Sequence, residues 1–265
     1  MFADVLKRVL LFNNYKVKHV VNITDVGHLT SDADAGEDKM IKALKREKLP
    51  MTKASMLKLA KKYTQQWQVD LQKLNVLDAD EYSRATEHIG QMVSMVEKIK
   101  KNGFAYEKDS AVYFDISKFK NYGKLARLKL DSLEAGARVD VDSDKKNPGD
   151  FVLWFKAVGK HAKHLMQWDS SFGKGFPGWH IECSAMSTHY LGEQFDIHTG
   201  GIDHIPVHHT NEIAQTEAAT GKKPWVNYWL HNDFIVVDKE KMSKSKGGFF
   251  VLSSLEEKGY GPLVY

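Results

Sequence analysis

"WHIECSAMSTHYLGEQFDIHTGGIDHIPVHHTNEIAQTEAATG", residues 179–221, is the stretch that decides the fold of this chain. Its first part is expected to form a helix that ends at Gly192, and residues 194–201 are expected to form a strand that ends in paired glycines. A second helix over residues 208–221 and a strand over residues 227–238 follow. Helices and strands that alternate in this way are typical of a parallel sheet covered on both faces. The sequence therefore predicts an α/β core.

The start of the chain shows the same alternation. Residues 2–13 place apolar side chains at helical spacing, and residues 15–24 read as a buried strand rich in β-branched side chains. The polar residues 25–40 are expected to form a loop at the carboxyl end of that strand, where open α/β sheets bind their ligands. Two long amphipathic helices are then expected, over residues 56–74 and 89–99.

The middle of the chain has a different pattern. Gly103 is expected to end the preceding helix, and from about residue 105 short alternating segments replace the long helices. "AVYFDI" at 111–116 and "FVLWFKA" at 151–157 read as strands, with a polar turn over residues 142–150 before the second. This region is expected to be an insertion of mixed or β character within the α/β core.

The composition limits the class of protein. With 265 residues, 42% of them hydrophobic, the chain is long enough for one large or two modest globular domains. No apolar run approaches the roughly 18 to 20 residues that a membrane span requires, and no signal peptide is recognisable, so a cytoplasmic location without a membrane partner is expected. The net charge of +4 permits a nucleic-acid partner without requiring one.

Three residues in two predicted helices form a candidate metal site. His208 and Glu212 are four residues apart, so their side chains would point from one helical face, and the thiolate of Cys183 would complete a Cys/His/Glu set suited to zinc. The pattern alone leaves the alternative open. Cys183 would then be a buried structural residue, and the negative charge of Glu212 would interact favourably with the dipole of a solvated helix N-terminus.

Other polar and small residues of this region also have two interpretations. Gly200 and Gly201 would let the backbone approach a ligand closely, or would form an ordinary turn after a strand. Asp203 would bind a sugar hydroxyl or cap the next helix, and Trp179 would form a pocket floor or pack in the core.

The segment "DKEKMSKSKGGFF", residues 238–250, is rich in lysine and follows a predicted strand. Lys241 and Lys244 would contact phosphate oxygens and stabilise the charge that develops on a leaving pyrophosphate. Composition alone favours the simpler alternative, a solvated lysine turn.

Taken together, these segments resemble the cysteinyl-tRNA synthetase family of class I aminoacyl-tRNA synthetases. "KMSKS" at 241–245 matches the signature loop of the class, and the resemblance extends in order over nearly the whole chain. The other segments that carry it are "NITDV", "AVYFDISKFKNYGKL", "GARVDV", "NPGDFVLW", "PGWHIECSAMSTHYLGEQFDIHTGGIDH", "HHTNEIAQ" and "VNYWLHNDFIVVDKEKMSKS".

The resemblance implies an architecture and a reaction. It implies a Rossmann-type parallel-sheet catalytic core interrupted by a mixed α/β connective insertion. The core would comprise residues 1–104 and 171–237, the insertion residues 105–170, and the signature loop with the start of a helical region residues 238–265. Such a protein activates L-cysteine with ATP and Mg²⁺ and transfers it to the 3′ end of tRNA(Cys), and we expect it to act as a monomer.

The resemblance also implies a role for each matching residue. A zinc ion held by Cys183, His208 and Glu212 would bind the substrate thiolate and reject serine, whose hydroxyl is a much poorer ligand. Thr24 and Trp179 would line the amino-acid pocket. The residues implied beside the adenylate and the ATP phosphates are His198, Gly200, Gly201, Asp203, Lys241 and Lys244.

The family has further parts that this sequence does not match. These are a first strand, a "CGPTVY"-like segment with a fourth zinc ligand, the "HIGH" signature and an anticodon-binding region. We therefore expect a fragment with little or no cysteine-dependent pyrophosphate exchange. Two alternatives remain at this stage: a relative of mycothiol ligase, which transfers cysteine to an amino sugar, and a non-catalytic remnant or binding protein.

Overall fold

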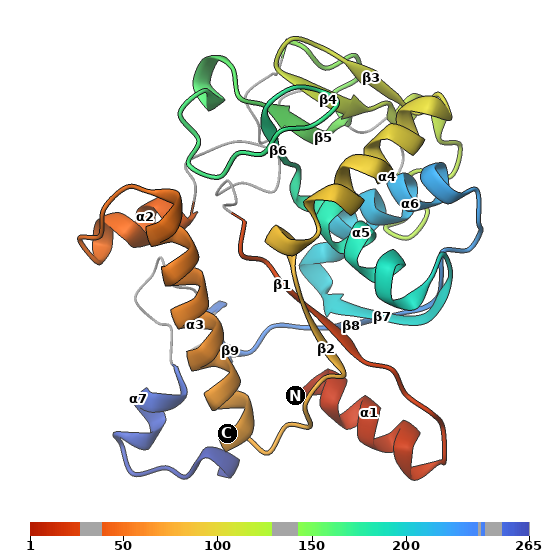
Figure 1. The fold of residues 1–265 in the computed structure, drawn as a ribbon. Helices are drawn as coiled ribbons and strands as arrows, with labels where there is room; N and C mark the ends of the chain where they lie inside the picture. The colour runs from red at the N-terminus through yellow and green to blue at the C-terminus, as the bar shows by residue number, and fades with distance from the viewer. Residues whose placement is uncertain (27–38, 129–142, 238–239, 242–250, 265) are drawn as a thin grey trace.

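The computed structural model describes residues 1–26, 39–128, 143–237, 240–241 and 251–264 (Figure 1). Its first parallel pair consists of β1 (Val20–Ile23) and β2 (Glu81–Arg84), with Val20 opposite Glu81. The helices around this pair are α1 (Phe2–Phe12), α2 (Lys39–Arg46) and α3 (Lys53–Lys73). None of the helices that the structure describes is both long and apolar enough to cross a membrane.

The second parallel pair lies in the stretch that the sequence singles out. β7 (Phe195–Gly201) pairs with β8 (Val226–Asn232) from end to end, and α6 (Thr210–Thr220) is the crossover helix between them. The helix expected before β7 is α5 (Trp179–Leu191). The α/β alternation is therefore confirmed, and the described residues arrange it as two parallel pairs that are not hydrogen-bonded to each other.

An antiparallel sheet separates these pairs along the chain. Its strands run in the order β3 (Ala105–Glu107), β4 (Ala111–Phe114), β5 (Phe151–Lys156) and β6 (Gly175–Pro177). The expected strands around residues 111 and 151 are thus present, and the sheet continues through β6, beyond the domain boundary expected at residue 170. In Figure 1 this sheet lies above α4 (Ile89–Lys101), α5 and α6.

The main core lies between the antiparallel sheet and these three helices. α4 contributes an apolar stripe at helical spacing, and it contacts both α5 and α6. Gly103 follows the end of α4 with φ +84°, the left-handed conformation that glycine adopts at helix ends, which confirms its expected role. The side chains that α4 buries are Met92, Met95, Val96 and Ile99.

Two strand predictions were wrong in extent. The strand expected over residues 227–238 stops at Asn232, because its partner β7 ends at Gly201, opposite Asn232. The chain then forms a short hairpin of β9 (Val236–Val237) and β10 (Glu240–Lys241). The strand expected over residues 15–24 shortens to β1. Most of the loop expected over residues 25–40 lies outside the described residues.

We expect Phe114→Ala to lower the free energy of unfolding by about 3–5 kcal/mol, the usual cost of removing a buried ring. Phe114 is fully buried, and its ring stacks on that of Phe151 with centroids 4.9 Å apart. Urea unfolding followed by circular dichroism measures the change. Val158→Ala is the control, since Val158 is 46% exposed. Equal losses in the two variants would contradict this account of the core.

Candidate functional site

The site is assembled where α5, β7 and α6 meet. α5 begins directly after β6, and the turn between them requires glycine, since a Cβ on Gly178 would lie 2.1 Å from the carbonyl oxygen of Val152. Before α6 the chain makes a π-helical turn, Ile205–His209, that carries His208. These two features bring the start of α5 and the start of α6 together.

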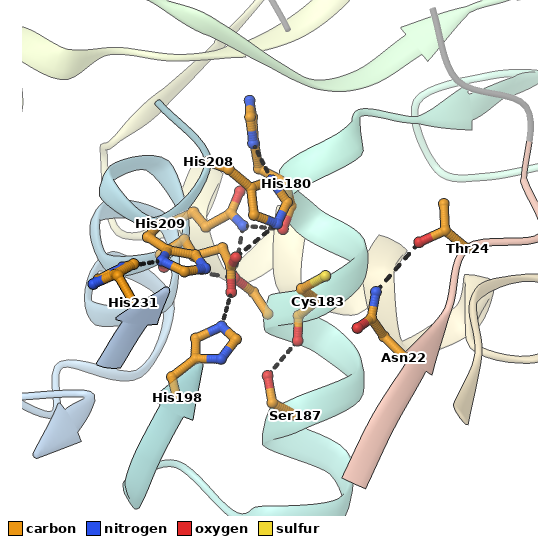
Figure 2. A network of polar contacts seen from close by, with 12 residues as sticks. Asn22, Thr24, His180, Cys183, Ser187, His198, His208, His209 and His231 are labelled. Atoms are coloured by element: carbon orange, nitrogen blue, oxygen red, sulfur yellow. Dashed lines mark hydrogen bonds and ion pairs between the residues drawn. The ribbon is translucent and has the colours of Figure 1, made fainter. Parts of the chain in front are cut away.

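The three candidate metal ligands converge at this point. Cys183 comes from α5, His208 from the π-helical turn and Glu212 from the first turn of α6. Their ligand atoms all lie within 4.8 Å of one another (Figure 2). The sequence predicted that His208 and Glu212 share a face, and the fold adds the thiol across from them.

Glu212 is the centre of the arrangement. Its side chain is fully buried. Oε2 accepts a hydrogen bond from Nε2 of His198 at 2.9 Å, and Oε1 lies 2.7 Å from Nε2 of His208. Burial by itself would raise the pKa of Glu212, but the charges of His198 and His208, together with the hydrogen bond from His198, outweigh it and hold the pKa well below its usual range. Glu212 is therefore a buried carboxylate anion.

The Cys183 thiol is neutral in its surroundings. Burial raises the pKa of the Cys183 thiol well above its usual value, and the carboxylates of Glu212 and Glu182 add to the effect. A metal cation beside Cys183 would reverse this balance, because a coordinating thiol loses its proton to the metal.

The donor set fits a zinc ion. Sulfur, imidazole nitrogen and carboxylate oxygen are the ligands that Zn²⁺ takes in proteins, and three protein ligands leave a coordination position for a substrate. Glu212 Oε1 is buried, and its contact with His208 lacks the geometry of a hydrogen bond, so this oxygen keeps acceptor capacity for a cation. His198, His209 and Glu212 form a second, overlapping group with the same spacing.

Further histidines surround the triad, and the sequence interpretation missed them. Nδ1 of His180 lies 2.9 Å from Nδ1 of His208, and Nδ1 of His209 lies 2.8 Å from Nε2 of His231. Burial lowers the pKa of His209 to about 2, so its ring is neutral. The one visible signal was the pair "HH" at 208–209, which did not indicate its partners on other elements.

The two residues expected around the amino acid are Trp179, on α5, and Thr24, after β1. Trp179 is the first residue of α5, and its ring centroid is 4.2 Å from that of His208. The Trp179 side chain is only partly buried, so it packs on His208 and is also accessible at the edge of the site. Thr24 follows β1, and its hydroxyl accepts a hydrogen bond from the Asn22 amide at 3.3 Å. Figure 2 shows Thr24 and His198 on opposite sides of Cys183.

The paired glycines at the end of β7 have a packing reason. A Cβ on Gly200 would lie 2.5 Å from Cε1 of His209, so glycine is needed for this histidine to approach the strand. A Cβ on Gly201 would lie 2.4 Å from Oδ1 of Asp203. Asp203 itself is exposed in the 3-10 turn Ile202–His204.

The lysine-rich segment is described only at its start. Lys241 belongs to β10, which pairs with β9 in the short hairpin. Lys244 lies outside the described residues.

Comparisons with known proteins agree on one family. The family model described as "tRNA synthetases class I (C) catalytic domain" matches residues 1–259. A cysteine–tRNA ligase of Treponema denticola is 52% identical over the whole chain, which covers 52% of that relative. Cysteine–tRNA ligase 1 of Burkholderia lata is 50% identical over the whole chain, which covers 55% of that relative. The chain thus spans about half the length of the curated relatives that it matches.

A solved structure agrees on the fold. A chain from Campylobacter jejuni, described as an arginyl-tRNA synthetase, superimposes with a TM-score of 0.54. The match covers 97% of this chain and 55% of the other, at 13% sequence identity. At this identity the likeness concerns the fold alone.

We expect the chain to bind Co²⁺, a spectroscopic substitute for Zn²⁺, with a sulfur-to-metal charge-transfer band in the near ultraviolet. Cys183→Ala should abolish the band, because Cys183 is the only sulfur donor in the triad. A titration followed by absorbance measures it, and His164→Ala is the control, since His164 lies outside both metal groups. A band that survives in Cys183→Ala would show that the metal binds elsewhere.

The buried carboxylate predicts a pH dependence of stability. The pKa of Glu212 is lower in the folded chain than in the unfolded chain, so the ionised carboxylate stabilises the fold. This stabilisation is complete above about pH 4.3, the ordinary glutamate pKa, and is lost as the pH falls from there toward the folded pKa. In EDTA, the unfolding free energy of the wild type should therefore fall more steeply below that pH than that of Glu212→Gln. Glu193→Gln, at an exposed position, should follow the wild type. Parallel curves for the wild type and Glu212→Gln would refute the assignment.

Proposed function

The chain belongs to the family of class I (C) tRNA synthetase catalytic domains, and on this basis we propose that it forms the catalytic core of a cysteine–tRNA ligase. The substrates would be L-cysteine, ATP with Mg²⁺, and tRNA(Cys). The cysteine carboxylate would attack the α-phosphate of ATP in line and pyrophosphate would leave, which gives cysteinyl-adenylate. A ribose hydroxyl of the 3′-terminal adenosine of the tRNA would then attack the cysteinyl carbonyl, and AMP would leave. The observation that carries the proposal is the convergence of Cys183, His208 and Glu212 within 4.8 Å.

Selection of cysteine would be the task of this triad. A zinc ion bound there would coordinate the thiolate of the substrate and discriminate against serine, because a hydroxyl is a much weaker ligand. The chain's contribution is to hold the three ligands in place. His198 fixes the Glu212 carboxylate through Oε2, which leaves Oε1 directed toward His208.

The amino-acid and nucleotide sides would meet at the carboxyl ends of β1 and β7. Thr24 follows β1, Trp179 borders the triad, and the glycine-rich end of β7 leads to Asp203. Ligands of α/β sheets bind at such strand ends. The residues proposed on the adenylate side are His198, Gly200, Gly201 and Asp203.

Catalysis would rest on positioning and charge. The reaction requires no covalent nucleophile from the protein, so its barrier is lowered by holding the reactants in line and by stabilising charge on the departing pyrophosphate. Lys241 and Lys244 are proposed as the phosphate contacts. Because tRNA is charged where proteins are made, the proposal includes a cytoplasmic location.

We expect L-cysteine to bind the zinc-loaded chain and L-serine to bind at least about a hundredfold more weakly, since a site built for one ligand atom rejects the analogue that lacks it. Isothermal titration calorimetry with each amino acid measures the difference. His208→Ala should remove cysteine binding, whereas His164→Ala, outside the metal groups, should retain it. Equal affinity for the two amino acids would overturn the proposed function.

A further inference from the structure

Positive charge is concentrated in one segment of the chain. Residues 39–62, which begin with α2 and end within α3, contain nine Lys or Arg residues and one acidic residue, Glu47. The rest of the chain contains 29 Lys or Arg residues and 33 Asp or Glu residues, so it is net negative. We call residues 39–62 the basic segment. The positive net charge of the chain comes from this segment.

An apolar cluster holds the basic segment in place on its inner side. Side chains of α2 and α3 pack against the chain between β5 and β6, and the fully buried members of the cluster are Leu44, Met56, Leu59 and Met166. Lys53, at the start of α3, adds a cation–π contact, with its Nζ 4.4 Å from the centroid of the Trp168 ring. The inner side of the segment is therefore fixed to the rest of the molecule.

The outer side of the basic segment carries the charges. Its exposed cations are Lys42, Lys45, Arg46, Lys48, Lys53, Lys58, Lys61 and Lys62. Glu47 forms an ion pair with Lys62 at 2.7 Å and lies 3.9 Å from Arg46. Within the described parts of the chain, ion pairs are absent at Lys42, Lys48, Lys58 and Lys61. The described residues therefore leave most of this positive charge without a counter-charge.

The spacing of the lysines is unfavourable for the chain by itself. Lys58 and Lys61 are three residues apart in α3, and Lys42 and Lys45 are three apart in α2. Residues at this spacing are neighbours on one helical face, where like charges repel and opposite charges attract. Interleaved acidic residues would relieve the repulsion, and a polyanion bound against the same face would turn it into attraction. The charge pattern therefore indicates a polyanionic partner.

We propose that the outer side of the basic segment binds the phosphate backbone of double-stranded RNA. Lysine side chains that contact phosphates release counterions, which gives affinity without sequence preference. Proteins that bind single strands need free aromatic rings on which bases stack. Here the Trp67 ring packs edge-on against the Tyr82 ring with centroids 5.8 Å apart, and the Tyr63 hydroxyl accepts a hydrogen bond from Arg46. The surface is therefore suited to the backbone of a duplex.

A membrane surface is another common partner of basic helices, and the packing of the segment argues against it. A helix that lies in a membrane surface inserts its apolar face among the lipids. In this structure the apolar faces of α2 and α3 are buried against Met166 and its neighbours. The choice of RNA among the remaining polyanions rests on the proposed function, whose partner is a tRNA.

The test is the fluorescence anisotropy of a labelled RNA hairpin of about sixteen base pairs, the length that one double-stranded-RNA-binding module spans. Lys58→Gln/Lys61→Gln should weaken binding about tenfold and reduce the slope of log K against log salt by about two, since each phosphate contact contributes about 0.9. The charge-retaining variant Lys58→Arg/Lys61→Arg should bind like the wild type, because a guanidinium also binds phosphate.

A matched control removes the same charge elsewhere. Lys98 and Lys101 are exposed in α4 at the same spacing, and Figure 1 shows α4 on the right of the molecule and α2 and α3 on the left. Lys98→Gln/Lys101→Gln should leave the affinity within about twofold of the wild type. Circular dichroism should show the same helix content in all variants. Equal weakening by the two glutamine pairs would overturn the proposal, because only the total charge would then matter.

Two other polyanions test the class of partner. The proposal is overturned if polyglutamate, or vesicles of equimolar phosphatidylcholine and phosphatidylserine, bind as tightly as the RNA. The measurement needs neither cysteine nor ATP nor metal, so it fails separately from the proposed function. A chain that prefers cysteine to serine but responds equally to both lysine pairs would overturn the RNA surface alone. A chain with the expected lysine dependence and equal affinity for the two amino acids would overturn the ligase assignment alone.

Discussion

The buried charge of Glu212 is the constraint on which the site depends. A carboxylate with no exposure to water must be compensated, or it would be protonated or would unfold the region around it. His198 from β7 and His208 from the π-helical turn provide the compensation at 2.9 and 2.7 Å. These contacts fix β7 and the start of α6 relative to each other. His209 then packs against β7 at Gly200, where a Cβ would lie 2.5 Å from its Cε1.

A second buried contact fixes the thiol relative to the carboxylate. The Gln215 amide donates hydrogen bonds of 2.6 Å to the carbonyl oxygen of His180 and to the hydroxyl of Ser184, and so joins α6 to α5 on either side of Cys183. Nearly all of α6 is buried, and its buried residues include more polar side chains than alanines. A helix chosen for hydrophobic packing alone would have the opposite balance. These polar side chains join α6 to its neighbours: Tyr122 donates a hydrogen bond to Asn211, and the backbone N–H of Trp225 donates one to Glu217.

Local patterns predicted the parts of this arrangement that lie within one element. The spacing of His208 and Glu212 was enough to place them on one face, and alternating helices and strands indicated the α/β core. The contact of His198 with Glu212 joins two elements, and it depends on the register of β7 against α6, which no pattern within either element encodes. The end of β8 at Asn232 was missed for the same reason: it is set by the partner strand β7, which ends opposite it at Gly201, and not by the strand-forming residues that follow in the sequence.

The surroundings of the candidate metal triad differ between its ligands. Glu212 is fully buried, whereas Cys183 also lines a cavity of about 980 Å³ between β1 and β7. Water in that cavity lies beside the thiol, and water weakens the attraction between charges. The charge interactions of Glu212 are therefore strongest on the side of His198 and His208, away from the cavity.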